Sequence, residues 1–120
     1  MAESTNKYRD LEERTFEFAR RCRDLVKGLP RTISNIEYGK QLVRSSGSQA
    51  ANYIEANEAL SKKDFSFKIK ICRKEAKESS LWLRLCETGG NAAPTKEQMS
   101  LSNEAIELRK IFSAILQKSL

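Results

Sequence analysis

The chain has 120 residues, of which 39% are hydrophobic, and it contains 5 Gly, 2 Pro and no His. A chain of this length builds one hydrophobic core, and the small number of helix-breaking residues favours an all-α fold over a β-rich one. Without histidine, Ser-His-Asp triads, His-ligated zinc or haem, and the Glu-x-x-His sites of ferritin-like bundles are all excluded.

The charge is also informative, since 22 basic residues against 16 acidic residues give a net charge of +6. A positive balance favours anionic partners, of which nucleic acid is the first candidate. The first ten residues contain no apolar run, and no stretch approaches the roughly 20 apolar residues of a membrane span. We therefore expect a cytoplasmic protein with no membrane partner.

The first predicted helix runs from about Arg9 to Lys27, and residues 1–6 are expected to be frayed. Gly28 and Pro30 are expected to end it, because glycine readily takes the left-handed conformation of a helix cap and proline disfavours helix in the residue before it. The apolar stripe of this helix recurs every three or four residues and contains Leu11, Thr15, Phe18, Cys22 and Leu25.

The second helix is predicted to begin with a capping box at Ser34 and Glu37 and to reach about Ala59. Gly39 and Gly47 are weak points, with an irregularity possible near Gly47. The small and mildly polar residues of its inner face favour close approach of a neighbouring helix. That face is predicted to contain Leu42, Ser46, Ala50, Tyr53 and Asn57.

The third helix is predicted to begin at the Ser61–Asp64 cap, to run to about Glu87 and to end at Gly89 and Gly90. Its inner seam alternates steps of four and three residues, and contains Phe65, Ile69, Cys72, Ala76, Ser79, Leu83 and Cys86. Four further apolar residues lie off this seam. We expect them to form an oligomer interface, made of Phe67, Ile71, Trp82 and Leu85.

The fourth helix is predicted to follow the loop Asn91–Pro94, to open with a capping box at Thr95 and Gln98, and to reach about Lys118. Its stripe contains Leu101, Ala105, Leu108, Phe112 and Ile115. Short connections place successive helices antiparallel. The chain is therefore predicted to be a single all-α domain over residues 1–120, an antiparallel up-down-up-down four-helix bundle.

The third helix carries most of the positive charge, with eight basic and four acidic residues between Ser61 and Glu87. Five of the basic residues follow one another at steps of seven, four, three and seven residues, which places them close to one face of the helix. These five are Lys63, Lys70, Lys74, Lys77 and Arg84. Such a stripe is suited to phosphates, and the alternative is a solvated face that keeps the protein soluble. The candidate nucleic-acid-binding residues are Lys63, Lys70, Arg73, Lys74, Lys77 and Arg84.

A second candidate group consists of polar residues on two neighbouring helices. Ser48, Asn52 and Glu55 form a line along the second helix, with Arg44 one turn before them, and the third helix carries the acidic pair Glu75 and Glu78. If the two lines face each other, Arg44 and Asn52 can pair with the carboxylates and fix the register of the helices. A ligand or RNA contact is the alternative. The group contains Arg44, Ser48, Asn52, Glu55, Glu75 and Glu78.

An enzymatic alternative rests on Glu55-x-x-Glu58 and Glu75-x-x-Glu78, since carboxylates at this spacing on adjacent helices can share Mg²⁺. The pattern is similar to that of Mg-dependent all-α nucleoside-triphosphate pyrophosphatases, which usually carry Asp where this chain has Glu78. Their other phosphate-binding features are not evident in the sequence. We therefore expect no enzymatic activity, no cofactor and no metal site, with the three cysteines in the core.

The chain resembles the small bacterial four-helix-bundle proteins that are encoded in intervening sequences of large-subunit ribosomal RNA genes and elsewhere in genomes. The resemblance covers nearly the whole chain, although an aromatic residue often found early in the first helix is not matched at Arg14 or Thr15. Its most specific stretches are YRDL at 8–11, RSSGSQAANYIEA at 44–56, SKKDF at 61–65, RKEAKES at 73–79 and WL at 82–83.

This resemblance implies a ring-like homopentamer, suspected nucleic-acid binding and no established enzymatic activity; related bundles are accessory subunits of reverse transcriptases in retroelements. The leading hypothesis is a noncatalytic homo-oligomer that binds structured RNA or other nucleic acid through the third helix. The alternative is a protein-protein scaffold, or an accessory subunit of a nucleic-acid enzyme, that does not contact nucleic acid itself.

Overall fold

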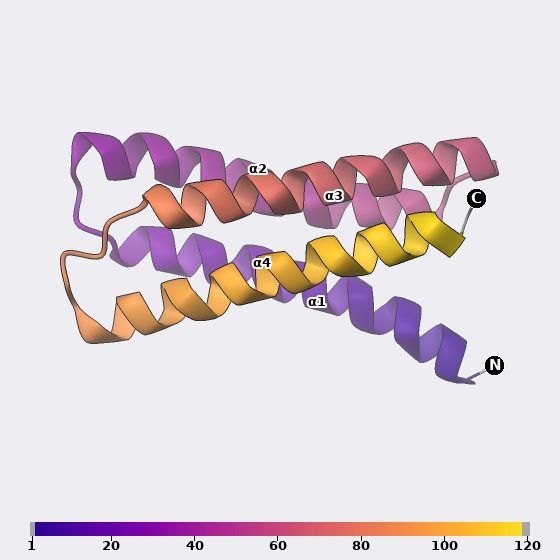
Figure 1. The fold of residues 1–120 in the computed structure, drawn as a ribbon, viewed down its shortest axis with the longest axis horizontal. Helices are drawn as coiled ribbons and strands as arrows, with labels where there is room; N and C mark the ends of the chain where they lie inside the picture. Colours follow the sequence, from indigo (N-terminus) through magenta and orange to yellow (C-terminus); the bar gives the residue numbers. More distant parts are fainter. Residues whose placement is uncertain (1, 119–120) are drawn as a thin grey trace.

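The computed structural model describes the backbone of residues 2–118 and the side chains of residues 10–118. Within this part of the chain there is no strand, and consecutive helices pack against each other while α1 packs against α4. Figure 1 shows the resulting up-down-up-down four-helix bundle, as the sequence predicts. The helices are α1 (Ala2–Gly28), α2 (Ile33–Asn57), α3 (Lys62–Leu85) and α4 (Ala92–Lys118).

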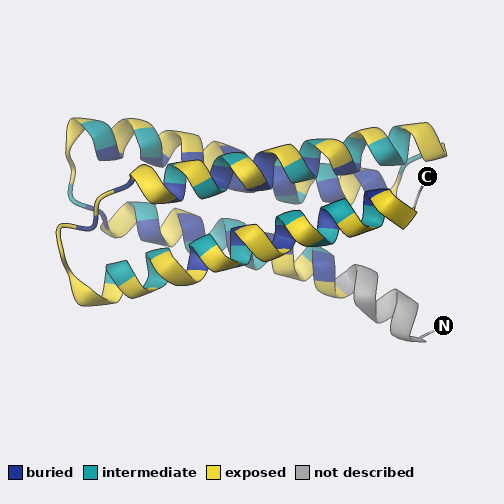
Figure 2. Ribbon diagram, in the orientation of Figure 1, coloured by how far each residue is buried: buried dark blue, intermediate teal, exposed yellow. Residues whose placement is uncertain are grey.

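The core is built from the predicted stripes of α1, α3 and α4 (Figure 2). Only Phe65 and Ile115, near the ends of their stripes, are partly buried. All three cysteines are buried and free. Burial raises the pKa of Cys22 and Cys72 to about 12, so both thiols are protonated and unreactive at neutral pH. Helix α1 begins at Ala2 and not near Arg9, so residues 2–6, which were expected to be frayed, are helical; Met1 lies outside the described residues.

The inner face of α2 differs from the prediction at two positions, because Ala50 is only half-buried and Asn57 is exposed. The predicted face takes two successive steps of four after Leu42, whereas the true face alternates four and three and so stays aligned with the core. Its buried residues are Asn35, Gly39, Leu42, Ser45, Ser46, Gln49, Tyr53 and Ala56.

Glycine has a defined role at Gly39, where a Cβ atom would lie 2.8 Å from Cγ1 of Val26 on α1. A larger residue there would force the two helices apart. At Gly47 the helix continues without the irregularity that the sequence raised, and a Cβ atom would meet nothing within 4 Å.

The helix ends are partly as predicted. The Ser61 hydroxyl accepts a hydrogen bond from the Asp64 N–H at 3.0 Å and caps α3. The cap of α2 is not at Ser34 but at Thr32, whose hydroxyl accepts from the Asn35 N–H at 3.1 Å. Gly28 remains helical. Among the described residues, only Gly89 and Gly90 have positive φ, and they form the turn after α3, which ends at Leu85.

The start of α4 is a further correction, because the helix begins at Ala92 and includes Pro94 in its first turn. Proline is tolerated there, since the first-turn N–H groups have no partner within the helix. Instead of closing a capping box with Thr95, the Gln98 amide donates to the carbonyls of Leu83 and Cys86, both at 2.7 Å. Gln98 therefore caps the end of α3 and joins it to α4.

The two loops at this end of the bundle are tied together by Asn35, which is buried. Its side-chain amide donates to the carbonyls of Pro30 at 2.9 Å and Glu87 at 2.8 Å, and its oxygen accepts from the Glu87 N–H at 2.9 Å. This residue therefore joins the start of α2 to the loop that follows α3.

Candidate nucleic-acid interface

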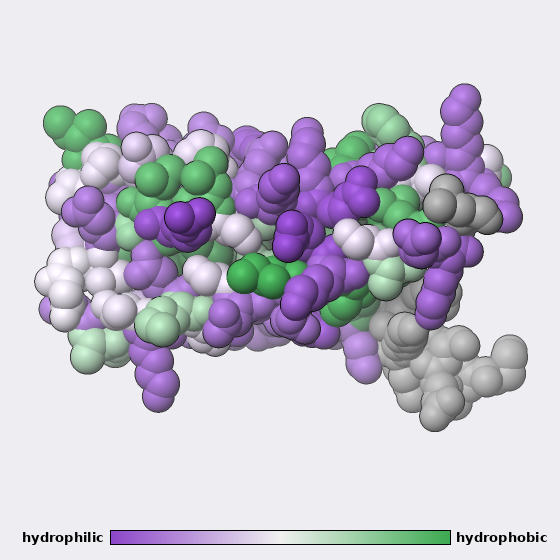
Figure 3. Space-filling model, in the orientation of Figure 1, coloured by the Kyte–Doolittle hydropathy of each residue, from purple (hydrophilic) through white to green (hydrophobic). Residues whose placement is uncertain are grey.

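The outward side of α3 is the candidate site. This helix packs against α2 and α4 through its seam, which leaves the opposite side exposed. Figure 3 shows hydrophilic side chains over much of the surface formed by α3 and α4, with hydrophobic ones exposed among them. We call the basic residues of this side the α3 basic face. It contains the exposed Lys63, Lys70, Lys74, Lys77 and Arg84, with Arg73 half-buried at its edge.

The cations of the α3 basic face form no ion pair with the acidic side chains that the structure describes. Of the eight basic residues between positions 61 and 87, only Lys68 makes an ion pair within the described residues, at 2.7 Å from Glu55. On α1, by contrast, the arginines whose side chains are described form ion pairs with carboxylates of α1 and α4. Those paired arginines are Arg14, Arg20, Arg21 and Arg23.

Two of the three acidic residues of α3 are paired with an arginine of α2 and not with the lysines of the basic face. Arg44 of α2 lies 3.2 Å from Glu75 and 3.2 Å from Glu78. The Glu75 side chain is almost fully buried, and its hydrogen bonds raise the pKa of Arg44. The predicted pairing of Arg44 with the α3 carboxylates is thus present, and it withdraws two negative charges from the neighbourhood of the lysines.

The rest of the predicted polar group behaves differently. The Asn52 amide donates to the Ser48 carbonyl at 2.9 Å and to its hydroxyl at 3.1 Å, within α2, and therefore does not pair with the acids of α3. A contact that the sequence did not reveal joins the same helices, because the hydroxyls of Ser45 and Ser79 lie 2.7 Å apart in the core. Serine at a seam position is the signal that was available for it.

The residues predicted as an oligomer interface are divided by the structure. Phe67 and Leu85 are exposed, whereas Ile71 and Trp82 are partly buried. The indole of Trp82 stacks on the ring of Tyr38, with 5.9 Å between ring centroids. Trp82 therefore contributes to the packing of α2 on α3.

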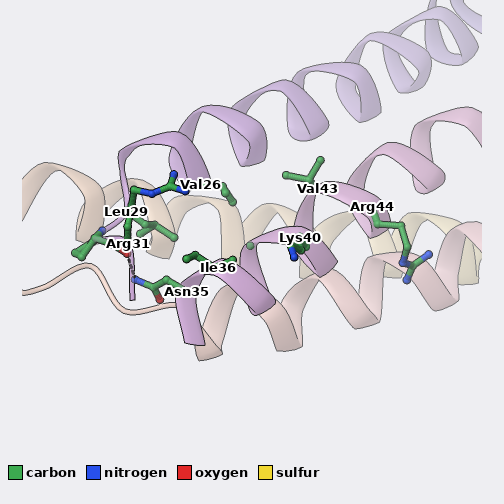
Figure 4. A pocket seen from close by; sticks show the side chains of 10 residues that line it. Val26, Leu29, Arg31, Asn35, Ile36, Lys40, Val43 and Arg44 are labelled. Carbon is green, nitrogen blue, oxygen red and sulfur yellow. Dashed lines mark hydrogen bonds between the residues drawn. The ribbon is translucent and has the colours of Figure 1, made fainter. Parts of the chain in front are cut away.

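An apolar surface with three exposed large residues and the half-buried Ala50 runs along α2, and the sequence did not single it out. Its residues recur at intervals that keep them on one side of the helix. Near its first residue a hollow between α1 and α2 is floored by Val26 and Leu29, with Arg31 and Lys40 also lining it (Figure 4). We call the surface the α2 apolar face, and it contains Ile36, Val43, Gly47, Ala50 and Ile54.

Three of the four carboxylates considered for Mg²⁺ are held in ion pairs between helices. Among the described residues, no three acidic or cysteine side chains gather closely enough to hold a metal ion. Glu55 binds Lys68, and Glu75 and Glu78 bind Arg44, so these acids are used in ion pairs between helices.

In the described part of the chain, no helix has the length and apolar content needed to span a bilayer.

Comparison with known proteins shows a family and a relative of known structure. Residues 9–114 match the family described as 23S rRNA-intervening sequence protein. The chain is 32% identical to a protein of unknown function from the S23 ribosomal protein family of Bacteroides thetaiotaomicron, whose crystal structure superposes with a TM-score of 0.76. The match covers 88% of this chain and 97% of that one. Among curated proteins there is no match.

Proposed function

The chain belongs to the 23S rRNA-intervening sequence protein family, and we propose that it is a noncatalytic helical bundle that binds structured RNA or other nucleic acid through the α3 basic face. One observation carries this proposal: within the described residues the cations of that face make no ion pair, and all except the half-buried Arg73 are exposed, whereas four arginines of α1 are paired with carboxylates. Unpaired cations attract phosphates without first breaking an ion pair, and binding releases counterions from the nucleic acid.

The length of the α3 basic face fits this role. Lys63 and Arg84 are 21 positions apart, which corresponds to about 30 Å along a helix. One strand of a duplex places about nine phosphates over this length. The face can therefore contact several phosphates at once, and contacts of this kind position the protein without reading the base sequence.

Lysine footprinting tests the location of the interface. At about 50 mM salt, duplex DNA or a structured RNA is expected to protect Lys70, Lys74 and Lys77 from acetylation, as measured by mass spectrometry. Lys27 and Lys96 serve as matched controls, since they are exposed and make no ion pair within the described residues. Equal protection of all five lysines, or protection of the two controls alone, would contradict the proposal.

We also infer that the chain self-associates through the α2 apolar face. Exposed isoleucine and valine along one side of a helix are typical of a surface that another chain covers. Small residues at Gly47 and Ala50 leave room for close approach of that chain. A second copy of the same protein is the simplest partner, and a homopentamer is the assembly that the family resemblance implies.

The replacement Val43→Asp is expected to break this assembly, because it places a charge in the middle of the apolar surface. Light scattering coupled to size exclusion should give the wild type a multiple of 13.7 kDa, about five if the pentamer forms, and the variant 13.7 kDa. The control Met99→Asp alters an exposed apolar residue of α4 and should keep the wild-type mass. A wild-type mass of 13.7 kDa at micromolar concentration would rule the self-association out.

A further inference from the structure

An aromatic ring lies within the α3 basic face. Phe67 is 59% exposed, which is unusual for a side chain of this size and polarity. It is four residues after Lys63, three before Lys70 and seven before Lys74. Residues at these intervals are neighbours on a helix surface. The ring therefore has lysines on both sides of it along the helix, and these lysines make no ion pair within the described residues.

The ring also lines a hollow in the surface. The hollow is formed by the first two turns of α3 together with the capping residue Ser61. Its lining contains two lysines and one acidic residue. The Ser61 hydroxyl accepts a hydrogen bond from the Asp64 backbone N–H. The lining residues are Ser61, Lys63, Asp64, Ser66, Phe67 and Lys70. This surface therefore combines an open aromatic ring with cations on both sides of it along the helix.

We propose that the hollow binds a single-stranded segment of nucleic acid, with one base stacked on the Phe67 ring and the adjacent phosphates on Lys63 and Lys70. This inference rests on the proposed function and specifies the form of nucleic acid recognised. A base inside a duplex is stacked on its neighbours and has no free face, whereas a base in a single strand or loop can lie flat on an aromatic ring. Lysine alone attracts both forms, so the exposed ring is what distinguishes them.

The stacking requires an open ring, and the structure supplies it. The other two aromatics of α3 offer no such platform, because Phe65 is partly buried against the core and Trp82 is partly buried and stacked on Tyr38. Phe16 of α1 is exposed to a similar extent, 55%, but lies on the helix diagonal to α3, where the arginines are paired. Phe16 is therefore a matched control for the exposure of an aromatic ring without the unpaired lysines.

Fluorescence anisotropy of the full chain with three probes tests the proposal: a single-stranded DNA and a single-stranded RNA of about twelve nucleotides, and a hairpin duplex. Phe67→Ala is expected to lower the affinity for both single strands by about 5- to 150-fold, the range for the loss of one stacked base. The affinity for the duplex should change by less than about twofold. Phe67→Tyr should retain tight binding and Phe67→Leu should not, because a leucine side chain has no aromatic face. Phe16→Ala should match the wild type.

The contrary outcomes are distinct from a failure of the proposed function. Phe67→Ala could lower the affinity for the single strands and the duplex equally, or lower neither. Either result would overturn the stacking on Phe67 and leave phosphate binding by the lysines intact. A lower mass of Phe67→Ala in light scattering would assign the ring to self-association and also overturn it. If the wild type binds none of the three probes at about 50 mM salt, both this inference and the proposed function are wrong.

Discussion

Replacing Ala76 with Glu is expected to destabilise the protein by about 3 kcal/mol or more, because it buries a carboxylate that has no partner. Ala76 is fully buried in the seam of α3, between the equally buried Cys72 and Ser79. The larger side chain also exceeds the available volume. For a domain of this size the loss corresponds to a fall of more than about 10 °C in the thermal midpoint, measured by circular dichroism.

The control for this experiment makes the same chemical change at an exposed position. Ala114→Glu on α4 adds the same charge and volume where the side chain faces water. Its thermal midpoint should stay within about two degrees of the wild type, since surface substitutions rarely exceed about 0.5 kcal/mol. An Ala76→Glu variant as stable as this control would show that the seam of α3 does not face the core.

Replacing Lys70, Lys74 and Lys77 together with Gln is expected to weaken nucleic-acid binding by at least about 100-fold at about 50 mM salt. Glutamine keeps good helix propensity, so the fold should survive. None of the three lysines makes an ion pair that the change would break, within the described residues. The loss should be similar for unrelated sequences, because phosphate contacts carry little sequence information. Equilibrium anisotropy with several RNA and DNA probes measures it.

A second triple variant separates the position of the charges from their number. Lys27, Lys96 and Lys118 are exposed on α1 and α4 and make no ion pair within the described residues. Their replacement with Gln lowers the net charge by the same amount, yet should change the affinity by less than about threefold. If both triple variants lose affinity equally, binding follows net charge, and the α3 basic face is not the interface.

The parts of the fold that follow from the sequence are those with strong apolar periodicity. The seam of α3 from Ile69 to Leu83 and the stripe of α4 from Leu101 to Phe112 are buried as predicted, because their hydrophobic residues leave one possible inner side. The inner face of α2 was less well predicted. Ser45 and Gln49 are fully buried there. Because both side chains are polar, the hydrophobic pattern of the sequence does not identify them as part of the inner face.

The candidate site was predictable in its charges but not in its partners. The spacing of Lys70, Lys74 and Lys77 places them on one side of a helix regardless of tertiary structure. Whether these lysines form ion pairs depends on the register of α2 and α3. In the observed register, Glu75 and Glu78 pair with Arg44 and not with the lysines. The long-range hydrogen bonds of Asn35 have no local signature in the sequence. The structure was needed to find them.

The most direct measurement is the salt dependence of nucleic-acid binding by the wild-type protein, followed by anisotropy between about 50 and 300 mM salt. Binding through the six cations of the α3 basic face predicts a linear plot of log K against log salt concentration, with a slope between about −4 and −5. The slope should become shallower by about two to three units when Lys70, Lys74 and Lys77 are replaced. A slope near zero, or no binding of RNA or DNA at the lowest salt concentration, would contradict nucleic-acid recognition and favour a protein-protein scaffold.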